Sequence, residues 1–265
     1  ASSRTLAVAL QTADYGSAMT DAAARADILF LTVPDREIEE AARSIRSVVR
    51  ENVMVLHCSG ALCSDILAPV KCQTGVQTGS LHPLQSFSGS STPGDLLGGC
   101  RFFYEGDPGT RDFCREAVAA FGARFYEIRP ESKALYHASA AAASNFFAAL
   151  EYYAVRLFHA AGIPEEEALA ALLPLVKGTL RNMEACGVPD ALTGPFERGD
   201  TDTVCRHLNA MARSAGELLD FYISAGHEAV RTALAKGSLD AVKAREIRDL
   251  LNRYKKKELS GDLEN

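Results

Sequence analysis

Three side chains that can donate or accept a proton lie at helical spacing in the middle of the chain. Lys133, His137 and Ser144 are separated by four and seven residues, which places them on one stripe of a helix, and Asn145 flanks that stripe. A lysine or histidine in such a position could meet the proton demand of a reacting heteroatom. The bland alternative, that Lys133 merely marks the start of the helix, is the stronger interpretation for Lys133 and the weaker one for His137.

A second candidate for proton chemistry is His82, in the segment GSLHPLQSF. Pro83 restricts the residue before it to extended conformations, so a rigid turn aims the His82 side chain. An imidazole with a pKa of about 6.5 exchanges protons at physiological pH. We therefore predict that His82 faces a substrate, with Gln85 and Ser86 nearby, although a capped turn histidine is an equally good interpretation.

Polar residues also follow the apolar run VMVL, in the segment VLHCSGA. Ser59 can donate a hydrogen bond to a bound ligand, and Gly60 permits the close approach of another group. Cys58 has no base or cation near it in the sequence, which argues against a reactive thiol. We predict a structural role for His57 and a binding role for Ser59 and Gly60.

The run ADILFLTVPD is nearly continuous in apolar residues, as expected for a central parallel strand covered on both faces. Pro34 ends the strand because it has no backbone N–H for the ladder. Thr32, Val33 and Pro34 then lie at the carboxyl end of the strand, where open α/β sheets bind ligands, and Ile38 lies one helical turn further on. Val33 and Ile38 are equally compatible with a core role. Asp35 is predicted to be a helix N-cap.

The elements that must position these residues follow two different patterns. Up to about residue 130, apolar runs alternate with helical or turn-rich segments, which is the rhythm of a doubly wound α/β sheet. Helices are predicted over 36–50 and 111–121, and the predicted strands are ILFLTV, VMVLHC, GSLHPL, RFFYEG and ARFYEI. We predict an α/β domain over residues 1–129.

From residue 130 onward the strand patterns disappear, and an all-helical substrate and dimerisation domain is predicted over residues 130–265. The predicted helices cover 131–161, 168–186, 201–213, 215–236 and 239–257. Asp200 and Ser238 are predicted N-caps, and Gly162 and Gly237 are predicted stops. In the first of these helices, the face opposite the proton-transfer stripe is predicted to be a core face formed by Leu135, Phe146, Leu150, Tyr153 and Leu157.

The bulk composition is that of an ordinary globular protein. The chain has 265 residues, a hydrophobic content of 47% and a formal net charge of -6, which gives no electrostatic reason to expect nucleic acid or an anionic membrane as a partner. No apolar stretch approaches the roughly 20 residues that span a bilayer, and no signal pattern begins the chain. Seven scattered cysteines without a CxxC pair favour a reducing compartment and argue against a metal site. We predict a cytoplasmic protein.

Several motifs together resemble those of a little-characterised family of Rossmann-like proteins with a helical C-terminal domain, assigned mostly as NADP-dependent oxidoreductases. The resemblance covers essentially the whole chain and rests on SRT, ADILFLTVPD, VLHCSGA, GSLHPLQSF, KALYHASAAAASNF and ALTGPFERGD. More distantly, the layout is similar to that of 3-hydroxyisobutyrate dehydrogenase, 6-phosphogluconate dehydrogenase and pyrroline-5-carboxylate reductase. The fold expected is a Rossmann-like sheet followed by a helical domain.

The resemblance implies NADP as the cofactor. In the wider group a serine or asparagine followed by Arg and Ser or Thr receives the adenosine 2′-phosphate, and Ser3, Arg4 and Thr5 match that motif. A guanidinium can bind a phosphate through two hydrogen bonds. The strand end from Thr32 to Ile38 is then expected to line the cofactor's path, with Ser59 near the nicotinamide. The family's first strand and glycine-rich loop would precede Ala1, and we interpret their absence as a missing segment.

The resemblance also bears on the substrate side. Related dehydrogenases carry a catalytic lysine and a nearby asparagine on the helix that corresponds to 131–161, and prephenate dehydrogenases have a His-Pro turn like that at His82. Hydride transfer to a carbonyl or imine creates a proton demand that one of these groups would meet. Which residue is the acid stays open. The expected catalytic residues are His137, Lys133, His82 and Asn145, and the expected substrate-binding residues are Gln85, Ser86, Ser144, Thr193 and Arg198.

The function predicted from the sequence is that of an NADP-dependent oxidoreductase acting on a small anionic carbonyl, hydroxy or imino compound. Two alternatives stay open: a noncatalytic sensor of a nucleotide or metabolite, and a dimeric scaffold without a cofactor. Alanine-rich helix faces, including Ala140 to Ala143, are consistent with close helix packing, and we predict a homodimer.

Overall fold

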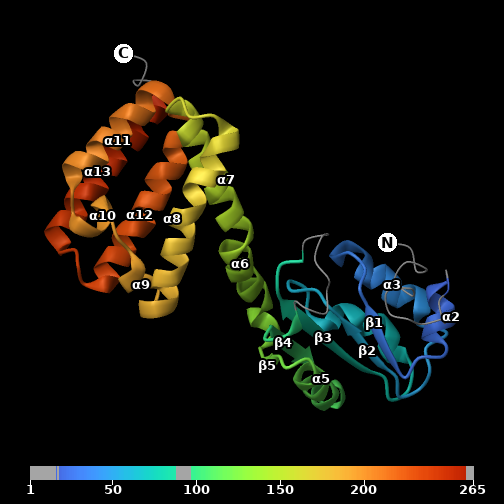
Figure 1. The fold of residues 1–265 in the computed structure, drawn as a ribbon. Helices are drawn as coiled ribbons and strands as arrows, with labels where there is room; N and C mark the ends of the chain where they lie inside the picture. The colour runs from blue at the N-terminus through green and yellow to red at the C-terminus, as the bar shows by residue number, and fades with distance from the viewer. Residues whose placement is uncertain (1–15, 17, 88–96, 261–265) are drawn as a thin grey trace. The chain divides into compact units, whose positions relative to one another are not determined.

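The chain packs as two compact units, Ala1–Phe146 and Phe147–Asn265. The computed structural model describes residues 16, 18–87 and 97–260, so the predicted phosphate site at Ser3, Arg4 and Thr5 lies outside the described residues. The first unit holds a β-sheet with helices, and the second is helical (Figure 1).

The sheet of the first unit has five strands in the order β1-β2-β3-β4-β5. β1, β2 and β3 are parallel to one another, β4 is antiparallel to β3, and β5 is parallel to β4. The strands are β1 (Ile28–Leu31), β2 (Met54–His57), β3 (Gln77–Leu84), β4 (Arg101–Gly106) and β5 (Arg124–Glu127). These are the five strands predicted from the apolar runs. β1 ends three residues before Pro34, consistent with the missing donor of that proline.

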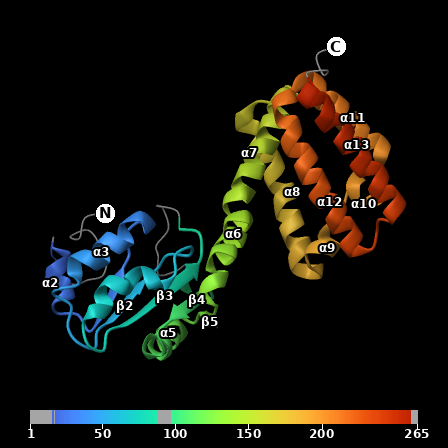
Figure 2. The ribbon, with the colours of Figure 1, turned by 180° about the vertical axis from the view of Figure 1, so that it is seen from behind.

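Helical segments cover the two faces of the sheet (Figure 2). They are α2 (Met19–Ala23), η1 (Asp35–Glu37), α3 (Ile38–Ile45), η2 (Ser64–Cys72), α5 (Pro108–Ala120), η3 (Pro130–Ser132) and α6 (Lys133–Ala143). Successive residues of a strand point to opposite faces, and the two faces have separate cores. Val55 packs with Ile38, Ala42 and Leu67 from α3 and η2, whereas its neighbour Leu56 packs with Cys114 and Val118 from α5.

The predicted coverage of β1 on both faces is wrong. Leu31 is buried in the core beneath α3, but Ile28 and Phe30, on the α5 side, are exposed. The reason is the position of α5, which contacts β3, β4 and β5 but has no comparable contact with β1. The strand is apolar on both sides, yet among the described residues only one side has a layer over it.

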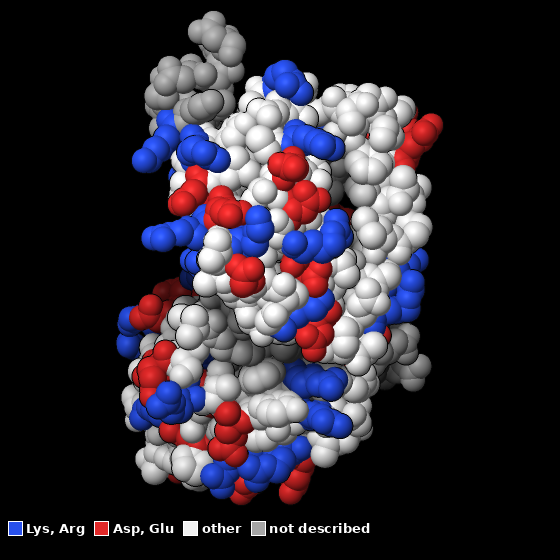
Figure 3. Space-filling view, turned by 90° about the vertical axis from the view of Figure 1, so that its left-hand side faces the viewer, with Lys and Arg blue, Asp and Glu red and all other residues white. Residues whose placement is uncertain are grey.

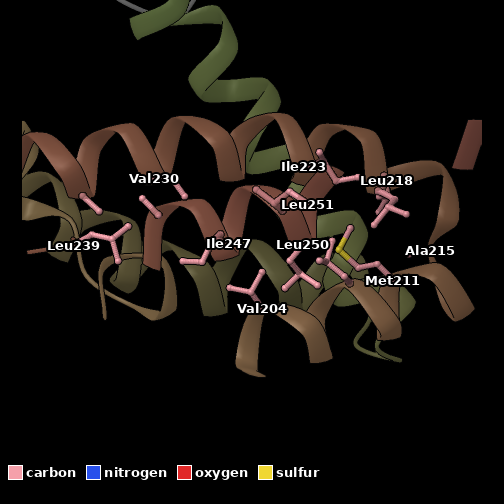
Figure 4. Packing of buried hydrophobic residues seen from close by; sticks show 14 residues of the cluster. Val204, Met211, Ala215, Leu218, Ile223, Val230, Leu239, Ile247, Leu250 and Leu251 are labelled. Carbon is pink, nitrogen blue, oxygen red and sulfur yellow. The ribbon is translucent and has the colours of Figure 1, made fainter. Parts of the chain in front are cut away.

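The second unit begins at Phe147, inside α7 (Asn145–Ala160). Its other helical segments are α8 (Glu165–Cys186), α9 (Val188–Ala191), α10 (Pro195–Arg198), α11 (Thr201–Ser214), η4 (Gly216–Leu218), α12 (Leu219–Lys236) and α13 (Ala241–Ser260). Its core lies between α11, α12 and α13, where Val204, Ile223, Ile247 and Leu251 interdigitate (Figure 4). Tyr153 and Leu157 of α7 pack against the edge of this core.

The helix ends of this unit confirm two sequence predictions and overturn a third. Asp200 caps α11 by accepting the Thr203 N–H at 3.0 Å, and Gly237, with φ of 78°, ends α12. Ser238 does not cap α13. Its hydroxyl donates to carbonyl oxygens, while Asp240 Oδ1 accepts the N–H groups of Val242 and Lys243 at 2.8 Å. The carboxylate stands closer to the first turn and satisfies two free donors there.

The single helix predicted over 131–161 is two helices, because a turn at Ser144, with φ of -119° and ψ of -65°, interrupts the helix between α6 and α7. Part of its predicted core face is also wrong: Leu135 is 78% exposed, Phe146 is 67% exposed and Leu150 is exposed as well. α6 belongs to the compact unit of the sheet, since its residues Lys133 and Tyr136 contact β3 and β4. The predicted domain boundary after residue 129 falls at the start of η3, between the last strand and α6.

The surface carries both signs of charge. On the face shown in Figure 3, lysines and arginines alternate with acids, and no large patch has one sign. In the part of the chain that the structure describes, every helix is too short or too polar to cross a membrane.

Candidate functional site

A row of buried polar side chains crosses three strands on the face of the sheet beneath α6. His57 of β2 is the register partner of Ser80 of β3, and Ser80 is the partner of Glu105 of β4. All three residues are buried. A buried polar side chain costs free energy of folding unless it has a hydrogen-bond partner. The groups that face this row must therefore supply those partners.

The partner of the row is Lys133, the first residue of α6, which is only 1% exposed. Its Nζ donates to Glu105 Oε1 at 3.0 Å and to the Ser80 hydroxyl. Glu105 also accepts the N–H and the hydroxyl of Ser64, both at 2.8 Å, and Ser80 Oγ donates to the carbonyl of Ser59 at 3.2 Å. Burial lowers the pKa of Lys133, and the Glu105 carboxylate opposes that shift.

Lys133 therefore does more than begin a helix. Through Ser80, Glu105 and Ser64, its ammonium group joins α6 to β3, to β4 and to the start of η2. The interpretation that Lys133 merely marks the helix start is wrong. Its Nζ is engaged inside the unit, and it is not among the residues that line the adjoining cleft.

The turn after β2 is closed by Ser59. Its hydroxyl donates to Asp35 Oδ2 at 2.8 Å and accepts the N–H groups of Ala61 at 3.2 Å and Leu62 at 3.0 Å. The prediction that Asp35 is a helix N-cap is wrong, because its carboxylate accepts the Ser59 hydroxyl and makes no capping bond. The proton that Ser59 was predicted to offer a ligand already has an acceptor in this structure.

Beside this turn, β3 and α6 form a cleft of about 510 Å³. It brings together six residues that the sequence singled out. They are His82, Gln85, Ser86, His137, Ser144 and Asn145. Leu84, Ser139 and small alanines of α6 complete the lining. None of these lining residues carries a formal charge other than what the two imidazoles can acquire, so the cleft offers neutral donors and acceptors.

His82 and His137 meet over Gly60. The centroids of the two imidazole rings are 6.1 Å apart, and Tyr136 Oη lies 2.7 Å from His82 Nδ1. A Cβ at Gly60 would approach His137 Cδ2 to 2.6 Å and His82 Nε2 to 2.8 Å, closer than real contacts allow. Glycine is therefore needed here so that the two imidazoles can pack against the β2 turn. Burial, aided by His137 and Lys133, lowers the pKa of His82 to about 4, so this imidazole is neutral at physiological pH.

His57 has a structural environment. Its Nδ1 accepts the Ser59 N–H at 3.1 Å, which leaves the proton on Nε2, and Nε2 is buried without a hydrogen-bond partner among the residues that the structure describes. Burial and the nearby Lys133 charge lower the pKa of His57 to about 4. A neutral, fully buried imidazole fits the structural role predicted for it.

The other predicted residues are more scattered. Thr32 and Pro34 are exposed at the carboxyl end of β1 and Val33 is half-buried, whereas Ile38 lies in the core beneath α3. Thr193 and Arg198 are exposed residues of the second unit, before and within α10. Neither is among the described residues that line the cleft of the first unit.

Sequence reasoning missed Glu105, Ser80, Ser64 and Tyr136. A signal for Glu105 was present in RFFYEG: alternation puts an acid on the same face as Phe103 inside an apolar strand, and such a buried acid requires a cation. Tyr136 lies one turn after Lys133 and beside His137, so its position on the helix was also available. Its pairing with His82, 54 residues away, was not.

The fold and the site thus define a Rossmann-like unit joined to a helical unit. Residues 2–83 match the Rossmann-like domain, and residues 100–229 match DUF2520, a domain of unknown function. Together with the five-stranded sheet and the helical unit, these two matches confirm the fold class predicted from the sequence, and they agree with the family resemblance of its motifs. No curated protein matches the sequence.

Solved structures share the fold across most of the chain. A proposed NADP oxidoreductase from Bacteroides fragilis is 21% identical, with 86% of this chain and 84% of that chain covered and a TM-score of 0.68. Protein TM1727 from Thermotoga maritima is 25% identical, with 97% and 87% covered and a TM-score of 0.62. Pyrroline carboxylate reductase from Plasmodium falciparum, solved with NADP bound, is 13% identical, with 89% and 82% covered and a TM-score of 0.56.

Among residues 16, 18–87 and 97–260, no group of three or more His, Cys, Asp or Glu side chains could hold a metal ion. The chemistry available at the cleft is that of imidazole, hydroxyl and amide groups, with a buried ion pair beneath them.

The first prediction concerns the buried ion pair. Replacing Lys133 with methionine leaves Glu105 buried without its cation, and we expect the free energy of unfolding to fall by about 3 to 5 kcal/mol. Lys71→Met is the matched control, because it removes an ion pair with Asp107 at the same 3.0 Å distance whose two side chains are partly exposed. We expect that control to cost less than about 1 kcal/mol. Urea unfolding followed by circular dichroism measures both, and equal losses would contradict the assignment.

The second prediction concerns the loss of stability at acidic pH. The pKa of His57 is about 4 in the folded protein and 6.5 as its ordinary value, so below pH 6.5 the unfolded chain takes up a proton that the folded chain does not. Acidification from pH 6.5 to pH 4 should therefore remove stability, on the order of 3 kcal/mol from this residue. Between pH 6.5 and pH 4, we expect the free energy of unfolding of His57→Gln to fall by about 3 kcal/mol less than that of the natural protein. Hydrogen exchange of the β2 and β3 amides at the two pH values provides the measurement, and parallel losses in both proteins would rule the effect out.

Proposed function

We propose that the chain is an NADP-dependent oxidoreductase that transfers hydride to or from a small anionic carbonyl, hydroxy or imino compound. The observation that carries this proposal is the meeting of His82 and His137 over Gly60, at the ligand-binding edge of a Rossmann-like sheet. Both imidazoles line a cleft large enough for a small molecule together with part of a larger one. The reductases that share the fold are consistent with this chemistry.

The described residues fit a nicotinamide cofactor in part. Thr32 and Pro34 leave their surface open at the carboxyl end of β1, next to the Ser59 turn. We assign the path of the cofactor to Thr32, Val33, Pro34 and the backbone of the turn at Gly60. Ile38 supports that edge from the core. The adenosine 2′-phosphate is assigned to Ser3, Arg4 and Thr5, whose hydroxyl and guanidinium donors suit a phosphate.

When bound, the reduced cofactor supplies a hydride. The chain's own residues must bind and orient the substrate and stabilise the negative charge that develops on its heteroatom. His82 or His137 faces the heteroatom that gains electron density. Gln85, Ser86, Ser144 and Asn145 provide the neutral hydrogen bonds that orient the substrate. Lys133 holds α6 in place and does so without contact with the substrate. Thr193 and Arg198 are assigned to the anionic group.

The third prediction tests binding and turnover together. We expect NADPH to bind to the protein in a fluorescence titration, and turnover with one class in a panel of 2-oxo acids, aldehydes and cyclic imines. His137→Gln should lower kcat about 100-fold, the lower end of what a positioned acid contributes, and leave NADPH affinity unchanged. His159→Gln, an exposed histidine of α7, is the control and should keep full activity. Binding without turnover across the panel would favour a sensor, and absence of binding would overturn the proposal.

We also propose that the chain forms a homodimer through α7 and α8. α8 is 22 residues long, yet among the described residues it buries only Ala168 and Leu172. Its exposed apolar side chains recur at helical spacing, and those of α7 continue the same character. They are Phe147, Leu150 and Tyr152 on α7, and Leu169, Leu173, Leu175, Leu180 and Met183 on α8. Exposed apolar surface of this extent marks an interface, and a second copy would bury it.

The fourth prediction follows from this surface. Leu175→Glu places a charge where we expect the partner, so the dimer mass in light scattering at micromolar concentration should fall to that of a monomer. Val242→Glu on α13 is the matched control, because Val242 and Leu175 are both 68% exposed. A monomer mass for the natural protein, or the same behaviour of the two variants, would exclude α7 and α8 as the interface.

A further inference from the structure

We infer that Tyr136 is a positioning residue that fixes His82 in the tautomer with its proton on Nε2, so that His82 presents a hydrogen-bond donor to the cleft. The tautomer itself is a property of the free protein. Its use in a reaction rests on the proposed oxidoreductase function.

The hydrogen bond between Tyr136 and His82 has a preferred direction. Tyr136 Oη lies 2.7 Å from His82 Nδ1, and in the described residues it makes no other hydrogen bond. A neutral imidazole has one donor nitrogen and one acceptor nitrogen, and the partner of one nitrogen decides which carries the proton. A phenol is a stronger acid than a neutral imidazole N–H, so Tyr136 donates and Nδ1 accepts. The single ring proton of His82 is then on Nε2.

The packing around Tyr136 holds its hydroxyl at this point. The ring of Tyr136 lies 4.4 Å from that of Phe103, and Phe103 is the register partner of His82 on the neighbouring strand. One turn earlier on α6, Lys133 engages the next pair on the same face of the sheet, Ser80 and Glu105. Two successive pairs of β3 and β4 thus fix two successive turns of α6. Burial raises the pKa of Tyr136, which keeps the phenol protonated and able to donate.

The opposite edge of the His82 ring is the one available to a ligand. Nε2 has no hydrogen-bond partner among the described residues, and it lies against Gly60, where even a methyl group would come within 2.8 Å. His82 lines the cleft together with Gln85 and Ser86. The pKa of His82, lowered to about 4, agrees with a neutral ring that carries only one proton.

This donor narrows the class of substrate. A carbonyl oxygen has lone pairs that accept the Nε2 proton, whereas a protonated iminium nitrogen has none. When hydride reaches the carbonyl carbon, the π electron pair moves to oxygen, and the oxygen takes its proton from the general acid, for which the proposed function offers His137, to become a hydroxyl. His82 keeps its own proton and stabilises the developing negative charge as a neutral donor. The site therefore suits carbonyl and hydroxy compounds better than iminium ions.

The fifth prediction is read from the free protein. Long-range proton–nitrogen correlation spectra of the natural protein with labelled histidine should show His82 with a protonated Nε2 and an unprotonated Nδ1. In Tyr136→Phe, which keeps the ring packed on Phe103, the two nitrogen signals should move towards each other as the tautomers mix. Tyr126→Phe is the control, because Tyr126 stacks on the same Phe103 at 5.3 Å without contacting His82. A proton on Nδ1 in the natural protein overturns the inference even if Tyr136→Phe fails to fold.

Kinetics separate this inference from the proposed function. If the protein reduces a carbonyl compound, Tyr136→Phe should lower kcat about tenfold or more, with NADPH affinity unchanged and Tyr126→Phe fully active. A natural protein with the expected spectrum that binds no NADPH would overturn the proposed function and leave the tautomer standing. An unchanged spectrum and unchanged kcat in Tyr136→Phe would show that Tyr136 does not position His82.

Discussion

The buried ion pair between Lys133 and Glu105 is the constraint that orders the rest of the first unit. Two charges removed from water must satisfy each other and their remaining hydrogen bonds, or the unit loses several kcal/mol. The pair meets this demand with groups from three places, because Ser80, Ser64 and the Ser59 carbonyl complete the network. The start of α6, the β2 turn, η2 and the two central strands are consequently fixed relative to one another.

The position of the cleft follows from that anchor. Alternate residues of β3 and β4 face α6, so after the pair Ser80 and Glu105 the next facing pair is His82 and Phe103. One helical turn beyond Lys133 comes Tyr136, which meets both of them. A helix rises about 4.5 Å in three residues and a strand about 6.6 Å in two, so the long tyrosine side chain spans the difference. The ion pair fixes α6 and thereby places the Tyr136 hydroxyl against His82, although Lys133 and Glu105 do not line the cleft.

Local periodicity in the sequence was sufficient for the strands, the helical half, the Asp200 cap and the Gly237 stop, because each depends on neighbouring residues. The sequence predicted only part of the proton-transfer stripe correctly. His137 and Asn145 do line a common cleft with His82, but Lys133 turns into the sheet because Glu105, 28 residues earlier, claims its charge. Likewise Ser238 had cap chemistry, yet Asp240 stood nearer to the free N–H groups. Pairings between distant strands and helices are set by register, and a single sequence does not state the register.

The electrostatics of the cleft also follow from the ion pair between Lys133 and Glu105. Glu105 neutralises the buried Lys133 beneath the cleft, and the described lining holds no lysine, arginine, aspartate or glutamate. Burial then lowers the pKa of His82 and leaves it a neutral donor. In the proposed function, such a lining would stabilise a developing oxyanion by a preorganised dipole, and it would not attract an anionic substrate by a net charge. An anionic group on the substrate would therefore need a cation that the described lining does not provide, which is the role proposed for Arg198 of the second unit.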